Sequence, residues 1–524
     1  MKKLLPLLFA CCALQVFSQT AKIDVQHYRF ELELSDSSDN ISGRALITVK
    51  FLQPASEIEF DLVNEDKGKG MTAYRAMENG NAITAAHANN KVVLKLPAPV
   101  KQNDVRTFEI LYNGVPKDGL IIAQNKFKRR TFFGDNWPDR ARNWLPCVDD
   151  PADKSSVEFV VTAPMHYQVV SNGVQVEETI LDRNKKLTHW KEDVALPTKI
   201  MVIGVAEFAV QYIGDTLNVP IYSWVYPQEK NNAFYDYSQA KEVLPFFINN
   251  VAPFPYRKLA NVQSTTIFGG MENAGCIFYT ENAISGKRKV EDLLAHEIAH
   301  QWFGDMATET TFAHLWLSEG FATYMTDLYI GTKYGVDSMN RRLDGERKEV
   351  IAFNRRGARP VVDTATKNYM QLLNANSYQK GGWALHMLRD LLGPEVFMQG
   401  VRAYYKQYGG SNASTDDFRR VMEKTSGKDL QSFFRQWLYT AGHPILDIKQ
   451  SHDAKKNELT ITVTQKQTTG FSFPLDVDIK TSKGVVRKTF KVTQQTQQFK
   501  VPNTGAADSL VIDPATRLLY EKAP

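Results

Sequence analysis

The chain of 524 residues contains only four cysteines, too few for a disulfide-built scaffold. Cys11 and Cys12 lie in the N-terminal leader segment described below, so only Cys147 and Cys276 remain in the mature part. These two are compatible with one disulfide in an oxidising compartment or with two buried thiols. They cannot form a Cys-rich metal site, which excludes zinc-finger-like modules.

The sequence also lacks a strong charge of one sign, internal repeats, low-complexity segments and any long apolar run after the N-terminus. The net charge of +5 falls to +3 when Lys2 and Lys3 are removed with the leader. This weak basic balance does not indicate nucleic-acid binding. Without a run of about 18 apolar residues, no transmembrane helix is predicted.

The N-terminus has the pattern of a secretory signal peptide. Lys2 and Lys3 precede an apolar stretch from residue 4 to 17, and Ser18 offers a small residue for cleavage before Gln19. Residues 1–18 are therefore predicted to be removed, with export to the periplasm or the medium. A lipid anchor at Cys11 is not predicted, because the preceding Leu-Phe-Ala fits a lipoprotein cleavage site poorly.

The length indicates two to four domains, and the periodicity changes twice along the chain. Residues 19–210 alternate apolar and polar positions, as in Tyr28, Phe30 and Leu32, which predicts an antiparallel β domain. Residues 211–445 change to helical spacing, and residues 446–524 return to alternation, which predicts a small β-sandwich. The expected fold class is α+β and multidomain.

Helical spacing is clearest in the middle segment. Residues 290–303 place apolar side chains three and four apart, and a second helix is expected from about Ser318 to Leu328. A third should end at Gly393-Pro394. Thr415, followed by two aspartates, is expected to cap the start of a further helix.

A metal-ligand pattern lies on the first of these helices. His296 and His300 are four residues apart and therefore face the same side of a helix. Glu297 lies between them, where it can polarise a metal-bound water. Glu319, in the first turn of the next predicted helix, can complete a His-His-Glu set. Two nitrogens, one oxygen and an open water position suit one zinc ion per chain.

A glycine-containing segment precedes this motif. Gly269 and Gly270 can expose backbone to an approaching peptide, and Met271 and Glu272 follow directly. A carboxylate beside a peptide groove can hold a cationic α-amine. Gly269, Gly270, Met271 and Glu272 are therefore predicted to bind substrate.

The chain resembles the zinc aminopeptidases that include aminopeptidase N and leukotriene hydrolase. The family's Gly-x-Met-Glu-Asn motif stands at residues 269–273, its metal motif at residues 296–300 with Glu319, and its Tyr-x-Lys-Gly element at Tyr378 to Gly381. With the segment at residues 144–151, the resemblance covers most of residues 20–450. It implies a β saddle, a thermolysin-like catalytic domain and a β-sandwich, without the family's large C-terminal helical domain.

The resemblance also implies roles for individual residues. Glu297 would be the general base, Glu272 would anchor the amine of a peptide with a free N-terminus, and Tyr378 would donate a hydrogen bond to the tetrahedral oxyanion. Gly270 and Asp305 depart from common family residues, and Asp135 or Asn136 is a candidate for a further amine anchor.

The predicted function is zinc-dependent removal of N-terminal residues from peptides. Two alternatives stay open: a thermolysin-like endopeptidase, and an inactive relative that only binds peptides. Epoxide hydrolysis, as in leukotriene hydrolase, is only a side possibility, since no residue here demands it. The preferred side chain, the physiological peptide and the oligomeric state do not follow from the sequence.

Overall fold

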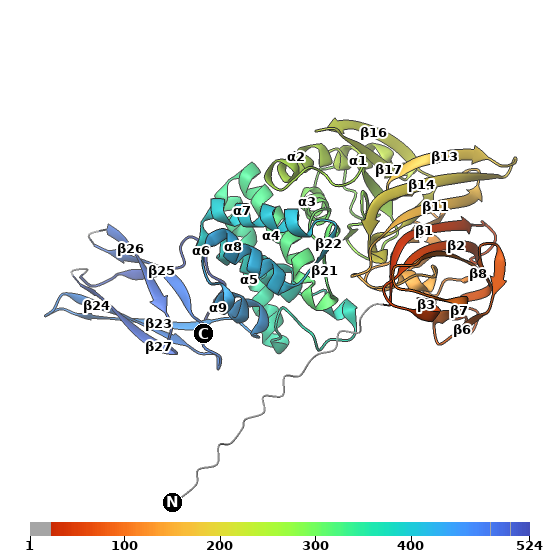
Figure 1. Cartoon of the computed structure of the whole chain (residues 1–524). Coiled ribbons are helices and arrows are strands. Elements are labelled where there is room, and N and C mark those ends of the chain that lie inside the picture. The colour runs from red at the N-terminus through yellow and green to blue at the C-terminus, as the bar shows by residue number, and fades with distance from the viewer. Residues whose placement is uncertain (1–21, 483, 503–504) are drawn as a thin grey trace, which may run out of the picture.

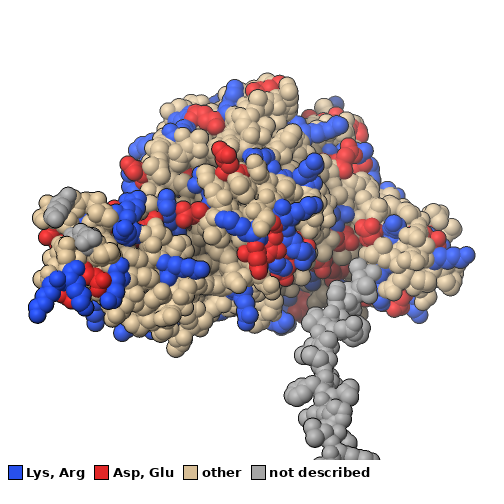
Figure 2. Space-filling view, turned by 60° about the vertical axis from the view of Figure 1, so that its left-hand side comes forward, with Lys and Arg blue, Asp and Glu red and all other residues tan. Residues whose placement is uncertain are grey.

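The computed structural model describes residues 22–482, 484–502 and 505–524, so the predicted signal peptide lies outside the described residues. A β-rich domain, a mainly helical domain and a small β-sandwich follow one another along the molecule (Figure 1). The predicted fold class is confirmed. In the space-filling view, basic and acidic side chains are mixed over the visible face (Figure 2).

An eight-stranded sheet forms the body of the N-terminal domain. Its strands bury every second residue, so that Tyr28, Phe30 and Leu32 of the first strand lie in the core as their alternation predicts. In spatial order the strands are β13 (Val174–Ile180), β14 (Lys185–Leu196), β11 (Ser155–Pro164), β1 (Ile23–Glu33), β2 (Ile41–Phe51), β8 (Val105–Val115), β4 (Gly70–Glu78) and β5 (Asn81–Ile83).

Two smaller sheets complete this domain and share its hydrophobic core. One is ordered β12 (Gln168–Ser171), β15 (Ile203–Ala206), β10 (Arg130–Gly134), β9 (Leu120–Gln124), and the other β3 (Ala55–Asp61), β7 (Lys91–Val100), β6 (Ala85–Ala88). The strand β10 leads directly into a loop that reaches the middle domain. The N-terminal domain can therefore contribute side chains to a site outside itself.

The middle domain begins with a five-stranded sheet. Its order is β16 (Ala209–Thr216), β17 (Val219–Val225), β18 (Leu259–Ser264), β20 (Cys276–Thr280), β19 (Gly270–Met271). The strand β19 pairs with β20 on one side only, so it is an edge strand. The predicted boundary between residues 210 and 211 falls just inside β16.

Nine α-helices follow or accompany this sheet among the described residues. They are α1 (Lys230–Tyr237), α2 (Ala240–Asn250), α3 (Glu291–His300), α4 (Trp316–Tyr334), α5 (Val336–Gly357), α6 (Gly381–Leu392), α7 (Pro394–Tyr408), α8 (Thr415–Ser426) and α9 (Gln431–Phe434). Two short strands, β21 (Ala307–Glu309) and β22 (Ser411–Ala413), pair beside them. Within the described residues, none of these helices has the length and apolarity needed to cross a membrane.

The predicted cap of α8 is wrong by one residue. Ser414, not Thr415, is the N-cap: its hydroxyl accepts from the Asp417 amide, and the Asp417 carboxylate accepts from the Ser414 amide. This reciprocal arrangement satisfies two backbone donors at once. Thr415 is instead buried, where its hydroxyl accepts the indole N–H of Trp316.

The last part of the chain forms two sheets. One is ordered β27 (Thr496–Pro502), β24 (Glu458–Gln465), β23 (Ile445–Asp453), β29 (Glu521–Lys522), and the other β26 (Gly484–Val492), β25 (Phe473–Thr481), β28 (Ser509–Ile512). Their inward side chains, such as Ile461 and Val477, are continuous with the core of the helical domain. The sandwich is thus packed onto that domain and does not hang from a linker.

Cys147 and Cys276 are both buried and both free, so of the two possibilities left open the structure has two thiols. Burial raises the pKa of both, to about 11 for Cys276. A thiol that stays protonated at neutral pH is a poor nucleophile and a poor metal ligand. Both cysteines therefore act as small apolar core residues.

The helix α4 is braced against α5 by a pair of buried carboxyl groups. Each of the carboxyl groups of Asp327 and Glu346 shifts the pKa of the other, and Asp327 accepts from Arg342 at 2.7 Å. Among the described residues, Asp327 Oδ2 and Glu346 Oε2 have no donor. Burial raises the pKa of Asp327 to about 6 and that of Glu346 well above its ordinary value, against the opposing charge of Arg342. We therefore expect the two carboxyl groups to share one proton at low pH.

We expect Glu346→Gln to raise the melting temperature at pH 8.5 by roughly 1–4 °C, with little change at pH 4.5. A carboxyl group whose pKa is raised in the native state stabilises the folded protein fully at pH values below its unfolded pKa, near 4. This contribution is lost as the pH rises through the native pKa values, which begin at about 6 with Asp327. Asp292 and Glu349 add negative charge nearby and strengthen this trend. The Gln amide supplies a permanent donor in place of the proton.

Thermal unfolding across this pH range measures the effect, with Glu395→Gln on the exposed face of α7 as the control. The same shift in melting temperature at pH 8.5 and pH 4.5 would show that Asp327 and Glu346 do not share a proton.

Candidate active site

The helix α3 presents two imidazoles on one face, as four-residue spacing requires. His296 Nε2 and His300 Nε2 lie 3.1 Å apart. His300 is almost completely buried, and its Nδ1 lies 3.0 Å from Ser318 Oγ and 3.1 Å from the Phe303 carbonyl oxygen. These contacts orient the ring so that Nε2 faces outward from the helix.

The first turn of α4 adds a carboxylate to the pair. Glu319 Oε2 lies 3.3 Å from Nε2 of both histidines. Burial favours the neutral carboxyl group, but the charge of His300 and hydrogen bonds from both imidazoles hold the pKa of Glu319 below its usual range. The structure thus brings the three predicted ligands together, with an anionic oxygen facing two nitrogens.

The three ligand atoms fit a zinc ion. Bonds of about 2.0–2.2 Å at a tetrahedral angle place neighbouring ligand atoms roughly 3.4 Å apart. The observed separations of His296 Nε2, His300 Nε2 and Glu319 Oε2 are 3.1, 3.3 and 3.3 Å. Three protein ligands are the number that leaves a fourth position open in catalytic zinc sites.

Glu297 lies on the same helix but does not join the three ligand atoms. It is 4% exposed and lines the cavity beside them. Gly270 of β19 approaches it so closely that a Cβ there would lie 2.2 Å from Glu297 Oε1. Glycine at this position leaves the space that the Glu297 carboxylate occupies.

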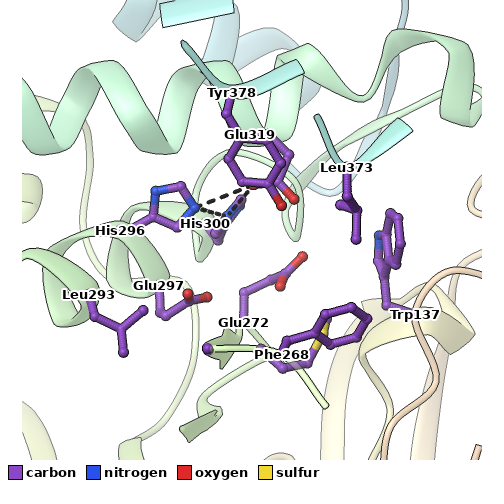
Figure 3. Close-up of a pocket in the computed structure, with 13 residues that line it drawn as sticks. Trp137, Phe268, Glu272, Leu293, His296, Glu297, His300, Glu319, Leu373 and Tyr378 are labelled. Atoms are coloured by element: carbon purple, nitrogen blue, oxygen red, sulfur yellow. Dashed lines mark hydrogen bonds and ion pairs between the residues drawn. The ribbon is translucent and has the colours of Figure 1, made fainter. Parts of the chain in front are cut away.

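Glu272 follows the edge strand β19 and extends its carboxylate into the same cavity (Figure 3). Its backbone carbonyl accepts from Gln301 Nε2 at 2.7 Å, which ties this loop to the end of α3. Because β19 pairs only with β20, its other edge is available to an extended peptide. Gly269, Gly270 and Met271 line the cavity here.

Tyr378 reaches the cavity from the π-helix Asn376–Lys380, and its ring lies parallel to that of His296 with centroids 5.9 Å apart. Extra residues in a helical turn rotate a side chain out of the regular helical path, and such turns are frequent at functional sites. The following glycine, Gly381, packs directly against Gly320, the residue after Glu319. This contact sets the distance between the segments carrying Tyr378 and Glu319.

We expect Gly320→Ala to destabilise the protein by about 1–3 kcal/mol, because the new Cβ would lie 2.9 Å from Gly381 backbone atoms that cannot rotate away. Urea unfolding measures this change. Gly345→Ala in α5 is the matched control: no atom lies within 4 Å of its Cβ, so we expect stabilisation of about 0.5–1 kcal/mol. Equal effects of the two substitutions would contradict the close packing of α4 against the Tyr378 segment.

The three metal-ligand residues, Glu297, Glu272, Tyr378 and the segment 269–271 all line one cavity of about 250 Å³. Four further residues line it that were not predicted from the sequence: Trp137, Phe268, Leu293 and Leu373. Phe268 directly precedes the predicted Gly269, and Leu293 lies one helical turn before His296, so both could have been found from their neighbours. Leu373 had no such signal.

The loop after β10 contributes Trp137 to the cavity, and not the two residues named as candidates. Asp135 is buried and accepts from Arg140, Thr266 Oγ1 and the Ile267 amide. Asn136 is buried too and is occupied by backbone carbonyls and by the Trp144 indole. Neither lines the cavity, so the expectation that one of them is an amine anchor is wrong.

Asp305 lies in the turn after α3 and is also absent from the cavity lining. It is fully buried, and its carboxylate oxygens have no donor among the described residues. Burial, aided by the charge of Glu272, raises its pKa well above the ordinary value. Its backbone carbonyl accepts from Lys154 of the N-terminal domain at 3.1 Å. The same carbonyl accepts from Thr308 Oγ1 at 2.7 Å, so it joins contacts within the middle domain to one from the N-terminal domain.

Sequence comparisons relate both large domains to known families. The description "Peptidase M1 N-terminal domain" matches residues 24–200, and "Peptidase family M1 domain" matches residues 235–437. A glutamyl aminopeptidase of Bitis rhinoceros is 29% identical over 380 residues, which are 67% of this chain and 38% of that protein. Aminopeptidase M1 of Arabidopsis thaliana is 29% identical over 368 residues, 66% of this chain and 41% of that protein. The chain thus spans about two fifths of these relatives.

The fold itself has a close counterpart among solved structures. Aminopeptidase A of Legionella pneumophila, solved in complex with aspartic acid, superposes with a TM-score of 0.84 at 19% identity. The match covers 97% of this chain and 60% of the other. The two family matches together cover more than half of the sequence and show that the chain belongs to peptidase family M1.

Proposed function

We propose that this protein is a zinc-dependent aminopeptidase that hydrolyses the first peptide bond of peptides with a free N-terminus. One observation carries the proposal: the His-His-Glu set and the Glu272 carboxylate share a single cavity of about 250 Å³. Ligand pockets of about 300–1,000 Å³ hold drug-sized molecules. This smaller cavity suits roughly the one residue that precedes the scissile bond.

His296, His300 and Glu319 would hold the zinc ion. When bound, zinc supplies Lewis acidity, which lowers the pKa of water and polarises a carbonyl group. The other groups belong to the chain. The Glu272 carboxylate binds the substrate ammonium, and the β19 edge accepts the extended backbone. Together these contacts set which peptide bond lies beside the metal ligands.

Proton transfer falls to Glu297. Its carboxylate takes a proton from the attacking water and passes it to the nitrogen of the leaving amine, since one group can serve both steps. The Tyr378 hydroxyl donates a hydrogen bond to the tetrahedral oxyanion. A phenol can donate without adding a charge to the site.

The cavity shape favours an exopeptidase over the endopeptidase alternative. Trp137, Phe268 and Leu373 lie on the side opposite His296, where an endopeptidase would need space for residues preceding the scissile bond (Figure 3). The inactive-relative alternative is disfavoured because all three metal ligands and Glu297 are present and line the same cavity.

A panel of aminoacyl fluorogenic amides, assayed with and without a chelator, tests the proposal. We expect hydrolysis that the chelator abolishes and zinc restores. Elemental analysis should find about one zinc per chain, strongly reduced in Glu319→Ala and absent in the double variant His296→Ala/His300→Ala. Full zinc retention in the double variant would exclude this set as the metal site.

Tyr378→Phe should lower kcat by roughly 100- to 1,000-fold, the cost of losing one oxyanion donor. KM should change far less, because phenylalanine keeps the ring against His296 and the hydroxyl acts mainly in the transition state. Steady-state kinetics separates the two constants. A change confined to KM would assign Tyr378 to substrate binding.

The proposal includes export to the periplasm or the medium, supported by the charged and apolar pattern of residues 1–18. N-terminal sequencing of the protein recovered from the periplasmic or extracellular fraction should begin at Gln19. A cytoplasmic protein that retains Met1 would overturn this part.

A further inference from the structure

Trp137 is the only cavity-lining residue that comes from the N-terminal domain among those described. Its side chain is 2% exposed, and its indole Nε1 has no hydrogen-bond acceptor among the described residues. Buried indole N–H groups are normally paired, because an unpaired buried donor costs free energy. An unpaired donor beside a ligand cavity indicates that its hydrogen-bond acceptor belongs to the ligand.

The position of this donor is well defined by packing. The Trp137 ring meets Phe268 and Phe312 edge-on, with centroids 5.9 and 5.8 Å away. The start of its loop is held by Asp135, whose carboxylate accepts from the Ile267 amide just before Phe268. In Figure 3 the indole nitrogen lies on the side of the ring that faces the cavity, across from His296.

We propose that Trp137 Nε1–H donates a hydrogen bond to the side chain of the substrate's N-terminal residue and thereby selects an uncharged acceptor, of which glutamine is the best example. This inference rests on the proposed aminopeptidase function and concerns its specificity. It assigns to the N-terminal domain a donor for the substrate side chain, in place of a second amine anchor.

The arrangement of the cavity leaves only the side chain as partner for this donor. An indole N–H cannot bind an ammonium group, which the Glu272 carboxylate takes. The scissile carbonyl must lie by the His-His-Glu set and Tyr378, on the other side of Glu272 from Trp137 (Figure 3). The substrate side chain is then directed toward the wall formed by Trp137, Phe268 and Leu373.

The charges around this wall favour a neutral side chain over an anionic one. A substrate carboxylate would lie near Glu272, and one neutral donor does not offset the cost of burying a charge. Two nearby cations already have partners: Arg140 pairs with Asp118 and Asp135, and Lys199 pairs with Glu309. Arg140 lies close to this wall. Its guanidinium lies over the ring of Phe268, 5.6 Å from the centroid, and does not line the cavity.

The test compares three fluorogenic amides that differ only in the N-terminal residue: glutamine, glutamate and norleucine, which have similar lengths. For the wild-type enzyme we expect the highest kcat/KM with glutamine. Trp137→Phe keeps an aromatic wall and removes the donor, so kcat/KM for glutamine should fall roughly 5- to 100-fold. The value for norleucine should change less than about threefold.

Phe268→Leu is the matched control, since it alters the same wall without removing a polar atom and should affect glutamine and norleucine alike. Equal losses for both substrates in Trp137→Phe would overturn the inference and assign Trp137 a purely packing role. A wild-type preference for norleucine or glutamate over glutamine would also overturn it, even if Trp137→Phe did not fold. Absence of hydrolysis of all three by the zinc-loaded wild type would instead refute the proposed function.

Discussion

Glu297→Gln should reduce turnover by about 100- to 10,000-fold, the usual contribution of general acid–base catalysis. The amide keeps the size of the side chain but cannot accept a proton from water. Because Glu297 is not among the three converging ligand atoms, zinc content should remain at the wild-type level. Single-turnover and steady-state kinetics, with elemental analysis of the same preparation, measure both quantities.

Glu291→Gln on the same helix is the control, because this residue bonds to Lys333 and Tyr329 and does not line the cavity. Its turnover should stay near that of the wild type. If Glu297→Gln retains both zinc and near-normal turnover, another group must move the proton.

Glu272→Ala should lower kcat/KM on free peptides by roughly 30- to 5,000-fold, because truncating one partner of a buried charge pair costs about 2–5 kcal/mol. N-acetylation of the substrate should have an effect of the same order in the wild type, since it removes the ammonium charge. Glu272→Gln keeps the shape and one acceptor, so its loss should be smaller. Peptide hydrolysis followed by mass spectrometry measures all three and shows whether residues leave one at a time.

The effects of Glu272→Ala and of N-acetylation of the substrate on kcat/KM should also be non-additive. Once Glu272 is replaced by alanine, acetylation should cost little more, because the partner of the ammonium is already gone. If the wild type instead cleaves acetylated and free peptides equally well, the endopeptidase alternative becomes the better description. Zinc content of Glu272→Ala should match the wild type in either case.

Much of the site follows from local patterns. His296 and His300 share a helix face because of the 3.6-residue period, and Glu297 lies beside them for the same reason. The alternation in β1 and β24 likewise predicts strands whose inward residues form the core. Such features depend on neighbours within a few positions, which is why they can be derived before any tertiary contact is known.

Features that depend on contacts between distant segments could not be derived in this way. The convergence of Glu319 and Tyr378 relies on two glycines 61 positions apart, Gly320 and Gly381, packing backbone to backbone. Whether Cys147 and Cys276 pair depends on how close the fold brings them, and in the structure both are free and buried. The choice of Ser414 over Thr415 as a cap was decided by the burial of Thr415 against Trp316.

The loop after β10 shows most clearly the difference between what the local sequence determines and what contacts between distant segments determine. Sequence reasoning pointed to Asp135 and Asn136 because their polar groups can bind an amine, but both are consumed by bonds to residues far along the chain. Trp137, the apolar neighbour, faces the cavity in their place. A residue's chemistry is encoded locally. Which of three adjacent side chains enters a site depends on how the two domains dock, because docking decides which polar groups already have partners.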